Sequence, residues 1–248
     1  MLEAVEVSKK YWDRSSGRQY DVLQSCSLQI AAGEAVGLMG PSGCGKSTLA
    51  RVLLRLLPTD SGRIIFQTQD VTQLSQKQLK PFRQQVQFIS QRPESFFDPL
   101  LKLGASLREP LHIFDLPDSS EIIEAALATV KLSPALLDRY PHQVSGGQCQ
   151  RAAIARALAV SPEILICDEA TSALDVTVQK QILELLIELK EKENLSFLLI
   201  CHDLALVQAL CDKVLVLYHG KTVEYGSPDE IIDHPKMDYT KRLIESVL

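Results

Sequence analysis

The stretch of sequence that decides the fold is Gly40-Pro41-Ser42-Gly43-Cys44-Gly45-Lys46-Ser47. It matches in full the pattern G-x-x-x-x-G-K-[S/T], in which glycines let successive backbone N–H groups turn toward one anion and the lysine reaches the β- and γ-phosphates of a nucleotide. A helix that starts at the lysine adds its positive end, and the next hydroxyl can bind Mg²⁺. A coincidental glycine-rich turn is the alternative, but glycine usage makes the whole pattern rare, on the order of one chain in a hundred. The predicted phosphate contacts are Gly40, Ser42, Gly43, Cys44, Gly45, Lys46, Ser47 and Thr48.

The segments on either side of this loop have the periodicity that such a site needs. Residues 35–39 form a short apolar run, which favours a buried strand, and residues 46–57 carry apolar side chains at helical spacing. Several further runs are continuous in Val, Ile and Leu, as is typical of parallel strands covered on both faces. The strand candidates are residues 63–66, 86–90, 164–167, 197–201, 214–217 and 222–225. The sequence thus predicts an α/β fold with a mainly parallel sheet.

The pattern changes between about Pro93 and Leu158, where strand-like runs are missing and helical spacing prevails, as in residues 121–130. We expect a helical subdomain over 93–158, inserted into a core that is made of residues 1–92 and 159–248. Near the end of the chain, Ser227 precedes Pro228 and has a glutamate three positions later, which predicts the start of a capped helix.

Composition and charge argue against several other classes of protein. The 31 acidic and 26 basic residues give a formal net charge of −5, so no dense basic surface indicates nucleic-acid binding. No apolar run approaches the roughly 20 residues that cross a bilayer, and the N-terminus lacks the layout of a signal peptide. We therefore expect a cytosolic protein unless a partner holds it at a membrane. The six cysteines are scattered without a C-x-x-C pair, which favours reduced thiols over a disulfide framework or a zinc site.

An acidic pair follows another strand candidate: Asp168 and Glu169 come directly after residues 164–167. Open α/β sheets bind ligands at the carboxyl ends of their strands. Asp168 is the candidate metal ligand, together with Ser47, and Glu169 is the candidate general base that polarises the attacking water. Alone the pair is weak evidence, because a solvated strand end has the same composition. Beside a complete phosphate loop it predicts a hydrolytic site.

The stretch Val144-Ser145-Gly146-Gly147-Gln148-Cys149-Gln150-Arg151 resembles the signature motif, usually written LSGGQ, of ATP-binding cassette (ABC) proteins. Ser145 with Gln148 is also a capping box, so a plain helix start is the alternative. The two interpretations are compatible, because the open N-terminal end of a capped helix binds anions. In the family this end, which is Ser145, Gly146, Gly147 and Gln148 here, closes on the γ-phosphate held by a second subunit.

The remaining family elements occur in order over nearly the whole chain. Tyr11 lies where the family stacks an aromatic ring on adenine, although a half-buried strand tyrosine beside Trp12 is the alternative. Gln91 resembles the Q-loop glutamine that contacts Mg²⁺ and links the site to the membrane partner. Asp175 closes a stretch that resembles the D-loop at the dimer interface. His202 resembles the switch histidine that contacts the γ-phosphate, with a structural histidine at a strand end as the alternative.

This resemblance implies a P-loop NTPase of the ABC ATPase fold, with a mainly parallel core sheet, an antiparallel β subdomain and the inserted helical subdomain. ATP and Mg²⁺ are the implied ligands, and two subunits that close head to tail would complete each other's sites. The implied partners are a second ABC ATPase subunit, integral membrane permease subunits and, indirectly, an extracytoplasmic solute-binding protein, with no nucleic acid. The protein would then act peripherally at the cytoplasmic face of the cell membrane, where the helical subdomain carries movement to the permease.

Within the family, the chain resembles the ATPases of peptide and nickel importers. The shared features are Phe97-Asp98-Pro99, Leu107-Arg108-Glu109-Pro110-Leu111, Arg139-Tyr140-Pro141-His142, His234-Pro235 and Tyr239-Thr240-Lys241-Arg242-Leu243. The chain departs from that branch at Arg92, where aspartate is usual, at Asp98, where asparagine is common, and at residues 237–238, where His-Pro is usual. The end at Leu248, without the C-terminal extension common in the branch, slightly favours nickel or metal-chelate uptake over peptide uptake. Two different ATPases commonly pair there, so we expect a heterodimer.

Two other classes of protein share parts of this pattern. A soluble, non-transport ABC ATPase usually carries two cassettes, long coiled coils or basic extensions, which this sequence lacks. A phosphate-loop kinase or GTPase would leave the signature, Gln91 and His202 unexplained. An ABC importer for another solute is the remaining alternative, since the ATPase of such a complex does not touch the solute.

Overall fold

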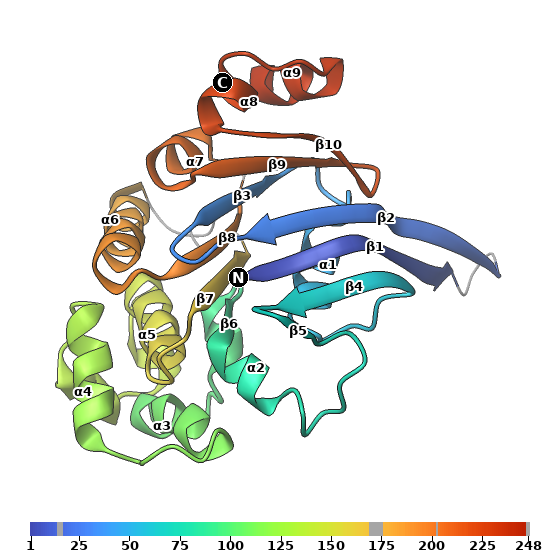
Figure 1. The fold of residues 1–248 in the computed structure, drawn as a ribbon. Coiled ribbons are helices and arrows are strands. Elements are labelled where there is room, and N and C mark those ends of the chain that lie inside the picture. Colours follow the sequence, from blue (N-terminus) through green and yellow to red (C-terminus); the bar gives the residue numbers. More distant parts are fainter. Residues whose placement is uncertain (14–16, 169–175, 202, 247–248) are drawn as a thin grey trace.

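A six-stranded sheet forms the centre of the molecule (Figure 1), and the computed structural model describes residues 1–13, 17–168, 176–201 and 203–246. The strand order is β10-β9-β3-β8-β7-β6, and all neighbours run parallel except β10, which is antiparallel to β9. The strands are β3 (Ala35–Met39), β6 (Val86–Ile89), β7 (Ile164–Asp168), β8 (Ser196–Ile200), β9 (Lys213–Tyr218) and β10 (Lys221–Gly226). The mainly parallel sheet expected from the sequence is confirmed.

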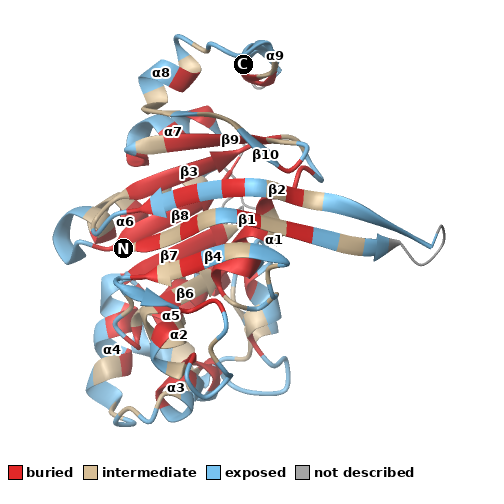
Figure 2. Ribbon diagram, turned by 45° about the vertical axis from the view of Figure 1, so that its right-hand side comes forward, coloured by how far each residue is buried: buried red, intermediate tan, exposed pale blue. Residues whose placement is uncertain are grey.

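Both faces of this sheet are covered, which explains why its strands are continuous apolar runs. Successive side chains of a strand point to opposite faces. In β3, Val36 and Leu38 join one apolar cluster with the helix α1 (Lys46–Leu53), whereas Ala35 and Met39 join a second cluster with α5 (Gly146–Leu158) and α6 (Val176–Glu193). Figure 2 shows the sheet as a mostly buried layer between more exposed elements.

A second, antiparallel sheet of order β2-β1-β4-β5 packs on the α1 side of the core. Its strands are β1 (Leu2–Asp13), β2 (Arg18–Ile30), β4 (Ser61–Phe66) and β5 (Gln69–Asp70). The β1–β2 hairpin projects well beyond the core (Figure 2). The antiparallel subdomain is confirmed, although the sequence pattern indicated only residues 63–66 as a strand in it. The register shifts between β1 and β2 interrupt the alternation of polar and apolar residues that would have revealed these two strands.

The chain between β6 and β7 contains no strand and carries the helices α3 (Leu103–Ile113), α4 (Ser120–Thr129) and α5. Helix α5 packs against both α3 and α4 and also touches β6. One continuous apolar cluster therefore runs from this helical part into the central sheet. The subdomain boundaries at 92/93 and 158/159 are not marked by a break in that core and stay a prediction.

The remaining helices are α2 (Lys80–Gln85), α7 (Leu204–Leu210), α8 (Pro228–Ile232) and α9 (Asp238–Glu245). Ser227 caps α8 in a capping box with Glu230, as the sequence predicted. The predicted helix over 46–57 is shorter, because Arg55 has a φ of 54° and the amides of Leu56 and Leu57 both donate to Arg51 O, which closes α1 at Leu53. Within the described ranges, no helix combines the length and the apolarity that a bilayer crossing requires.

Candidate functional site

The phosphate loop joins β3 to α1 and depends on backbone angles that favour glycine. Gly40, Gly43 and Gly45 have φ values of 150°, 78° and 113°. A Cβ atom on Gly40 would lie 2.2 Å from Leu217 O, and one on Gly45 would lie 2.7 Å from Val22 O. A Cβ atom on Gly43 would meet nothing within 4 Å. Gly40 and Gly45 thus allow close packing behind the loop, whereas Gly43 faces the open space in which an anion can lie.

A cavity of about 280 Å³ lies directly at this loop. Its lining residues are Val22, Ser42, Gly43, Gly45, Lys46, Ser47 and Thr48. Among the predicted phosphate contacts, Gly40 and Cys44 are buried and do not line the cavity. Burial raises the pKa of the Cys44 thiol, against the opposing effect of the Lys46 ammonium, so the thiol stays neutral near pH 7. Val22 is a lining residue that the sequence does not reveal, because the bulge that places it beside the loop has no distinctive residue pattern.

Lys46 is 6% exposed, and its ammonium donates hydrogen bonds to Gly40 O at 2.7 Å and Pro41 O at 3.0 Å. These bonds hold the charge in the wall of the cavity. Both acceptors are neutral, so the ammonium keeps a positive potential toward the open space, and the N-terminal end of α1 adds to it. The loop therefore has the charge and the shape that a phosphate group requires.

The predicted metal ligands lie at the same edge of the central sheet as the loop. Leu38 of β3 pairs with Ile200 of β8, which in turn pairs with Asp168 at the end of β7. Two strand spacings separate Asp168 from Leu38, which is roughly 10 Å. Gln91 follows the end of the neighbouring strand β6 by two residues and is exposed. With the Ser47 hydroxyl in the cavity, these side chains offer the oxygen ligands that Mg²⁺ prefers.

Three predicted site residues, Glu169, Asp175 and His202, lie outside the described residues. In the sequence, Glu169 directly follows the last residue of β7, and His202 follows the last residue of β8 by two positions. Both strands end at the edge where the phosphate loop lies.

Tyr11 is half-buried near the end of β1, opposite Tyr20 of β2. The two rings stack with their centroids 6.2 Å apart and their planes 26° apart. The adjacent Trp12 is 61% exposed. Neither Tyr11 nor Trp12 lines the cavity in the described part of the chain, but the partner strand β2 contributes Val22 to it. The hairpin thus flanks the phosphate loop, with Tyr11 farther out.

The signature stretch begins α5. The amide of Gln148 donates to Ser145 Oγ at 3.2 Å, and the amide of Ser145 donates to Gln148 Oε1 at 3.0 Å, so the capping box predicted from the sequence forms. Ser145, Gly146 and Gln148 are exposed, whereas Gly147 is buried, where a Cβ atom would lie 2.6 Å from a methyl of Val178. Among the described residues that line the phosphate-loop cavity, none belongs to this stretch. Within the described residues, the chain alone does not bring its two predicted anion sites into one cavity.

Comparison with known proteins gives the same family from sequence and from structure. Residues 23–172 match the model of the family described as ABC transporter. The chain is 42% identical to the oligopeptide transport ATP-binding protein OppF of Haemophilus influenzae, over 91% of this chain and 69% of that protein. It is 40% identical to the oligopeptide transport ATP-binding protein AppF of Bacillus subtilis, over 100% of this chain and 78% of that protein.

Similar solved structures include the dimeric ABC transporter cassette MJ0796, with a TM-score of 0.83 and 28% identity over 92% of this chain and 99% of that one. A second MJ0796 dimer, in a post-hydrolysis state with ADP and Pi, has a TM-score of 0.82. The cbiO1 protein of Clostridium perfringens, part of the transporter complex cbiONQ, has a TM-score of 0.82 and 27% identity over 99% of this chain and 93% of that one. The phosphate loop, the sheet that carries it and these likenesses agree, and the chain belongs to the ABC transporter family as one of its ATP-binding, ATP-hydrolysing proteins.

Proposed function

We propose that the chain binds Mg-ATP in the phosphate-loop cavity and hydrolyses it to drive uptake of peptides through a membrane permease. The observation that carries the nucleotide part is the Lys46 ammonium, which neutral loop carbonyls hold in the wall of a cavity open at Gly43. The loop amides and this ammonium would bind the β- and γ-phosphates of ATP.

The remaining roles follow the edge of the sheet. Ser47, Asp168 and Gln91 would hold Mg²⁺, which neutralises charge that builds up on the phosphates during transfer. Glu169, one residue beyond β7, would orient the attacking water and accept its proton. His202 would contact the γ-phosphate, and Asp175 would lie at the contact with a second subunit. Tyr11 would stack on the adenine, on the hairpin beside the cavity.

A second ATPase subunit would complete the site. The exposed capping box of Ser145 leaves the N-terminal end of the 13-residue helix α5 open to solvent, where it can bind an anion brought by another molecule. The related cassette MJ0796 has been solved as a dimer. We propose that Ser145, Gly146, Gly147 and Gln148 contact the γ-phosphate held by the partner's loop. The partner would be a different ATPase, as is common in the branch that the sequence resembles.

The variant Ser145→Arg tests this sharing. ATP binding to the variant's own loop is expected to stay within about twofold of wild type, while hydrolysis in the assembled transporter falls at least about tenfold, because the large cation blocks the face that meets the partner's nucleotide. The measurements are the dissociation constant for ATP and the steady-state release of phosphate.

A matched control is Ser227→Arg, which removes the capping box of α8 and introduces the same side chain elsewhere. Loss of either cap costs about 1 kcal/mol, so stability should fall similarly in both variants. Only Ser145→Arg should lose hydrolysis, and a fully active Ser145→Arg complex would rule out the shared site.

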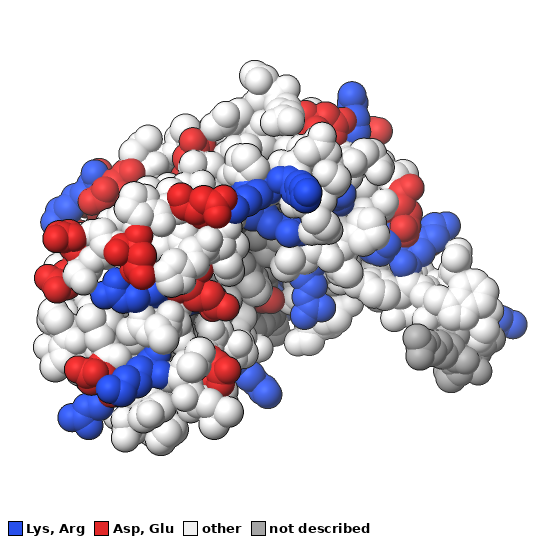
Figure 3. Space-filling view, turned by 90° about the horizontal axis from the view of Figure 1, so that it is seen from below, with Lys and Arg blue, Asp and Glu red and all other residues white. Residues whose placement is uncertain are grey.

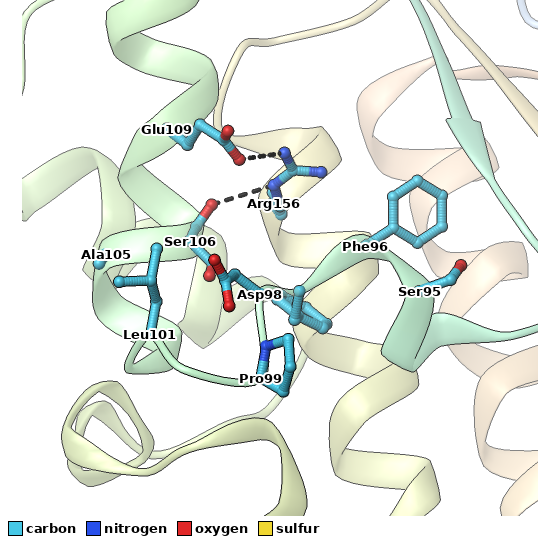
Figure 4. Close-up of a pocket in the computed structure, with 10 residues that line it drawn as sticks. Ser95, Phe96, Asp98, Pro99, Leu101, Ala105, Ser106, Glu109 and Arg156 are labelled. Atoms are coloured by element: carbon cyan, nitrogen blue, oxygen red, sulfur yellow. Dashed lines mark hydrogen bonds and ion pairs between the residues drawn. The ribbon is translucent and has the colours of Figure 1, made fainter.

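The permease would dock on the helical part of the chain. A cavity of about 760 Å³ lies between the segment after Gln91 and α3 (Figure 4), with apolar walls from Phe96, Phe97 and Leu101. On one side, Arg156 pairs with Glu109 at 2.7 Å and donates to Ser106 O at 3.0 Å. Acidic and basic side chains alternate over the face seen from below (Figure 3). A mixed surface of this kind, beside a cavity with both apolar and charged walls, suits a protein partner.

Peptide is the solute that the relatives favour, because both OppF and AppF are named as oligopeptide transport proteins. Nickel and metal-chelate uptake, which the sequence analysis ranked slightly higher, has no comparable support. We propose a location at the cytoplasmic face of the cell membrane, where such a complex would hold the chain.

Three measurements test the function as a whole. The purified chain with its partners should release phosphate from ATP in the presence of Mg²⁺ without phosphorylating a second substrate. Affinity purification of the tagged chain should recover an integral membrane protein. If the chain were a soluble, non-transport ABC ATPase, no membrane protein would be recovered with it. A strain that lacks the gene should lose uptake of labelled peptides and keep nickel uptake. Loss of nickel uptake alone would move the assignment to a metal importer.

A further inference from the structure

The C-terminal stretch Tyr239-Thr240-Lys241-Arg242-Leu243 has no part in the function proposed so far. It forms most of α9, which Leu243 and Ile244 anchor by burial in the same apolar cluster as Val214 and Val216 of β9. Glu224 of β10 fixes the approach to this helix, because its carboxylate accepts hydrogen bonds from the amides of Lys236 at 2.8 Å and Met237 at 3.2 Å. The helix is therefore tied to the end of the central sheet.

Tyr239 of α9 stacks on Tyr218, the last residue of β9. The two ring centroids are 3.8 Å apart and the ring planes differ by 23°. Tyr218 also meets the ring of His219 edge-on at 4.2 Å. His219 and Gly220 form the tight turn between β9 and β10, with φ values of 45° and 74°. Tyr239 thus covers the strand end from which this turn begins.

The same turn is bonded to the phosphate loop. The amide of Gly220 donates to Cys44 O at 3.1 Å, and Gly220 O accepts from the amide of Gln24 at 2.7 Å. Gly40 approaches Leu217 so closely that a Cβ atom would lie 2.2 Å from Leu217 O. Residues 217–220 are therefore the backbone support on which the loop rests from Gly40 to Cys44.

Tyr239 is partly shielded from solvent where it stacks beside the turn. Burial raises the pKa of the Tyr239 phenol, and the Cys44 thiol and the Tyr218 phenol add to the rise. The ring is half-buried, between α9 and the turn. The Tyr239 ring therefore lies against the strand end that leads into the turn, and this turn is hydrogen-bonded to Cys44 O.

We propose that Tyr239 is a positioning residue for the phosphate loop, acting through its stack on Tyr218. The stack fixes the end of β9 and the turn at residues 219–220. Through the hydrogen bond from Gly220 N to Cys44 O, the fixed turn restricts the backbone of the loop. The proposal rests on the proposed function, in which the loop binds ATP. Without the ring, the loop amides point less uniformly toward the phosphates and ATP binds more weakly.

The test compares Tyr239→Ala, Tyr239→Phe and the control Tyr225→Ala in the full-length chain. Tyr225 is a tyrosine of the adjacent strand β10, is 43% exposed and contacts Lys213 rather than the turn. Hydrogen exchange of the amides at residues 40–48 and the dissociation constant for Mg-ATP are measured for each chain. An aromatic pair is worth a factor of roughly 2 to 12 in an equilibrium constant.

Tyr239→Ala is therefore expected to speed exchange in residues 40–48 and to weaken ATP binding by that factor. Tyr239→Phe should restore both, since the stack needs the ring and not the hydroxyl, and Tyr225→Ala should leave both unchanged. Equal exchange at residues 40–48 in Tyr239→Ala and wild type would overturn the proposal, as would a defect shared by Tyr225→Ala. The exchange measurement needs no nucleotide, so it separates this proposal from the proposed function, which fails if wild type does not bind Mg-ATP.

Discussion

Replacing Lys46 by alanine is expected to weaken ATP binding by roughly 10- to 150-fold, the range for loss of a hydrogen bond to a charged group. Lys46 is 6% exposed, its ammonium is fixed by Gly40 O and Pro41 O, and the residue lines the cavity that the loop glycines open. No other lining residue of that cavity in the described part of the chain carries a positive charge. Titration of the purified variant with a fluorescent ATP analogue in the presence of Mg²⁺ measures the effect.

The control for Lys46→Ala is Lys190→Ala. Lys190 is also partly buried and also donates to a backbone carbonyl, Leu210 O at 3.0 Å, with Asp212 as its ion partner at 2.8 Å. The control removes a comparable anchored ammonium away from the cavity, so it reports any general loss of stability. ATP affinity should stay at the wild-type value in Lys190→Ala. Unchanged affinity in Lys46→Ala would contradict the assignment of the loop as the nucleotide site.

The Glu169→Gln variant is expected to bind ATP normally and to hydrolyse it at least about 100-fold more slowly. A glutamine in this position keeps the size and polarity of the side chain but cannot accept the proton of the attacking water, and general-base help is worth roughly this factor. Single-turnover hydrolysis in the assembled complex separates the chemical step from nucleotide binding. The prediction rests on the sequence position of Glu169, one residue beyond the end of β7.

Glu163→Gln is the matched control, because Glu163 directly precedes the same strand at its opposite end. Its carboxylate accepts hydrogen bonds from Gln67 Nε2 at 3.1 Å on the surface. The same loss of one charge should leave hydrolysis within about twofold of wild type there. If Glu169→Gln hydrolyses ATP at nearly the wild-type rate, the general base is another residue.

The sequence predicts the strand, loop and helix around Lys46 because these parts are local. Strand, glycine loop and helix follow one another within 35–57, and the hydrogen bonds from Lys46 to Gly40 O and Pro41 O lie within that stretch, so the motif itself contains the geometry that holds the ammonium at the loop. The same holds for the capping boxes at Ser145 and Ser227, whose partners are three residues away. Local hydrogen bonds of this kind can be predicted without knowing the rest of the fold.

The features that the sequence did not predict depend on contacts between distant segments. Val22 reaches the cavity through a bulge whose place depends on the register with β1, and Gly220 supports Cys44 across 176 positions of sequence. Strands β1 and β2 were not predicted because their alternation of polar and apolar residues is interrupted. The stack of Tyr239 on Tyr218 forms only when α9 packs against the central sheet. The solute is harder still, because no described feature of the chain recognises it.

The separation of the Ser145 helix end from the cavity of its own chain has a kinetic consequence. In the proposed mechanism a single molecule can bind ATP, but it supplies only one of the two surfaces that hydrolysis of that ATP requires. The rate of hydrolysis then depends on how often two ATP-bound subunits associate and how long they stay together, so in solution it varies with the protein concentration. A shared permease would hold both subunits close together, so the rate of hydrolysis would no longer depend on their concentration. ATP would then be hydrolysed mainly where transport can occur.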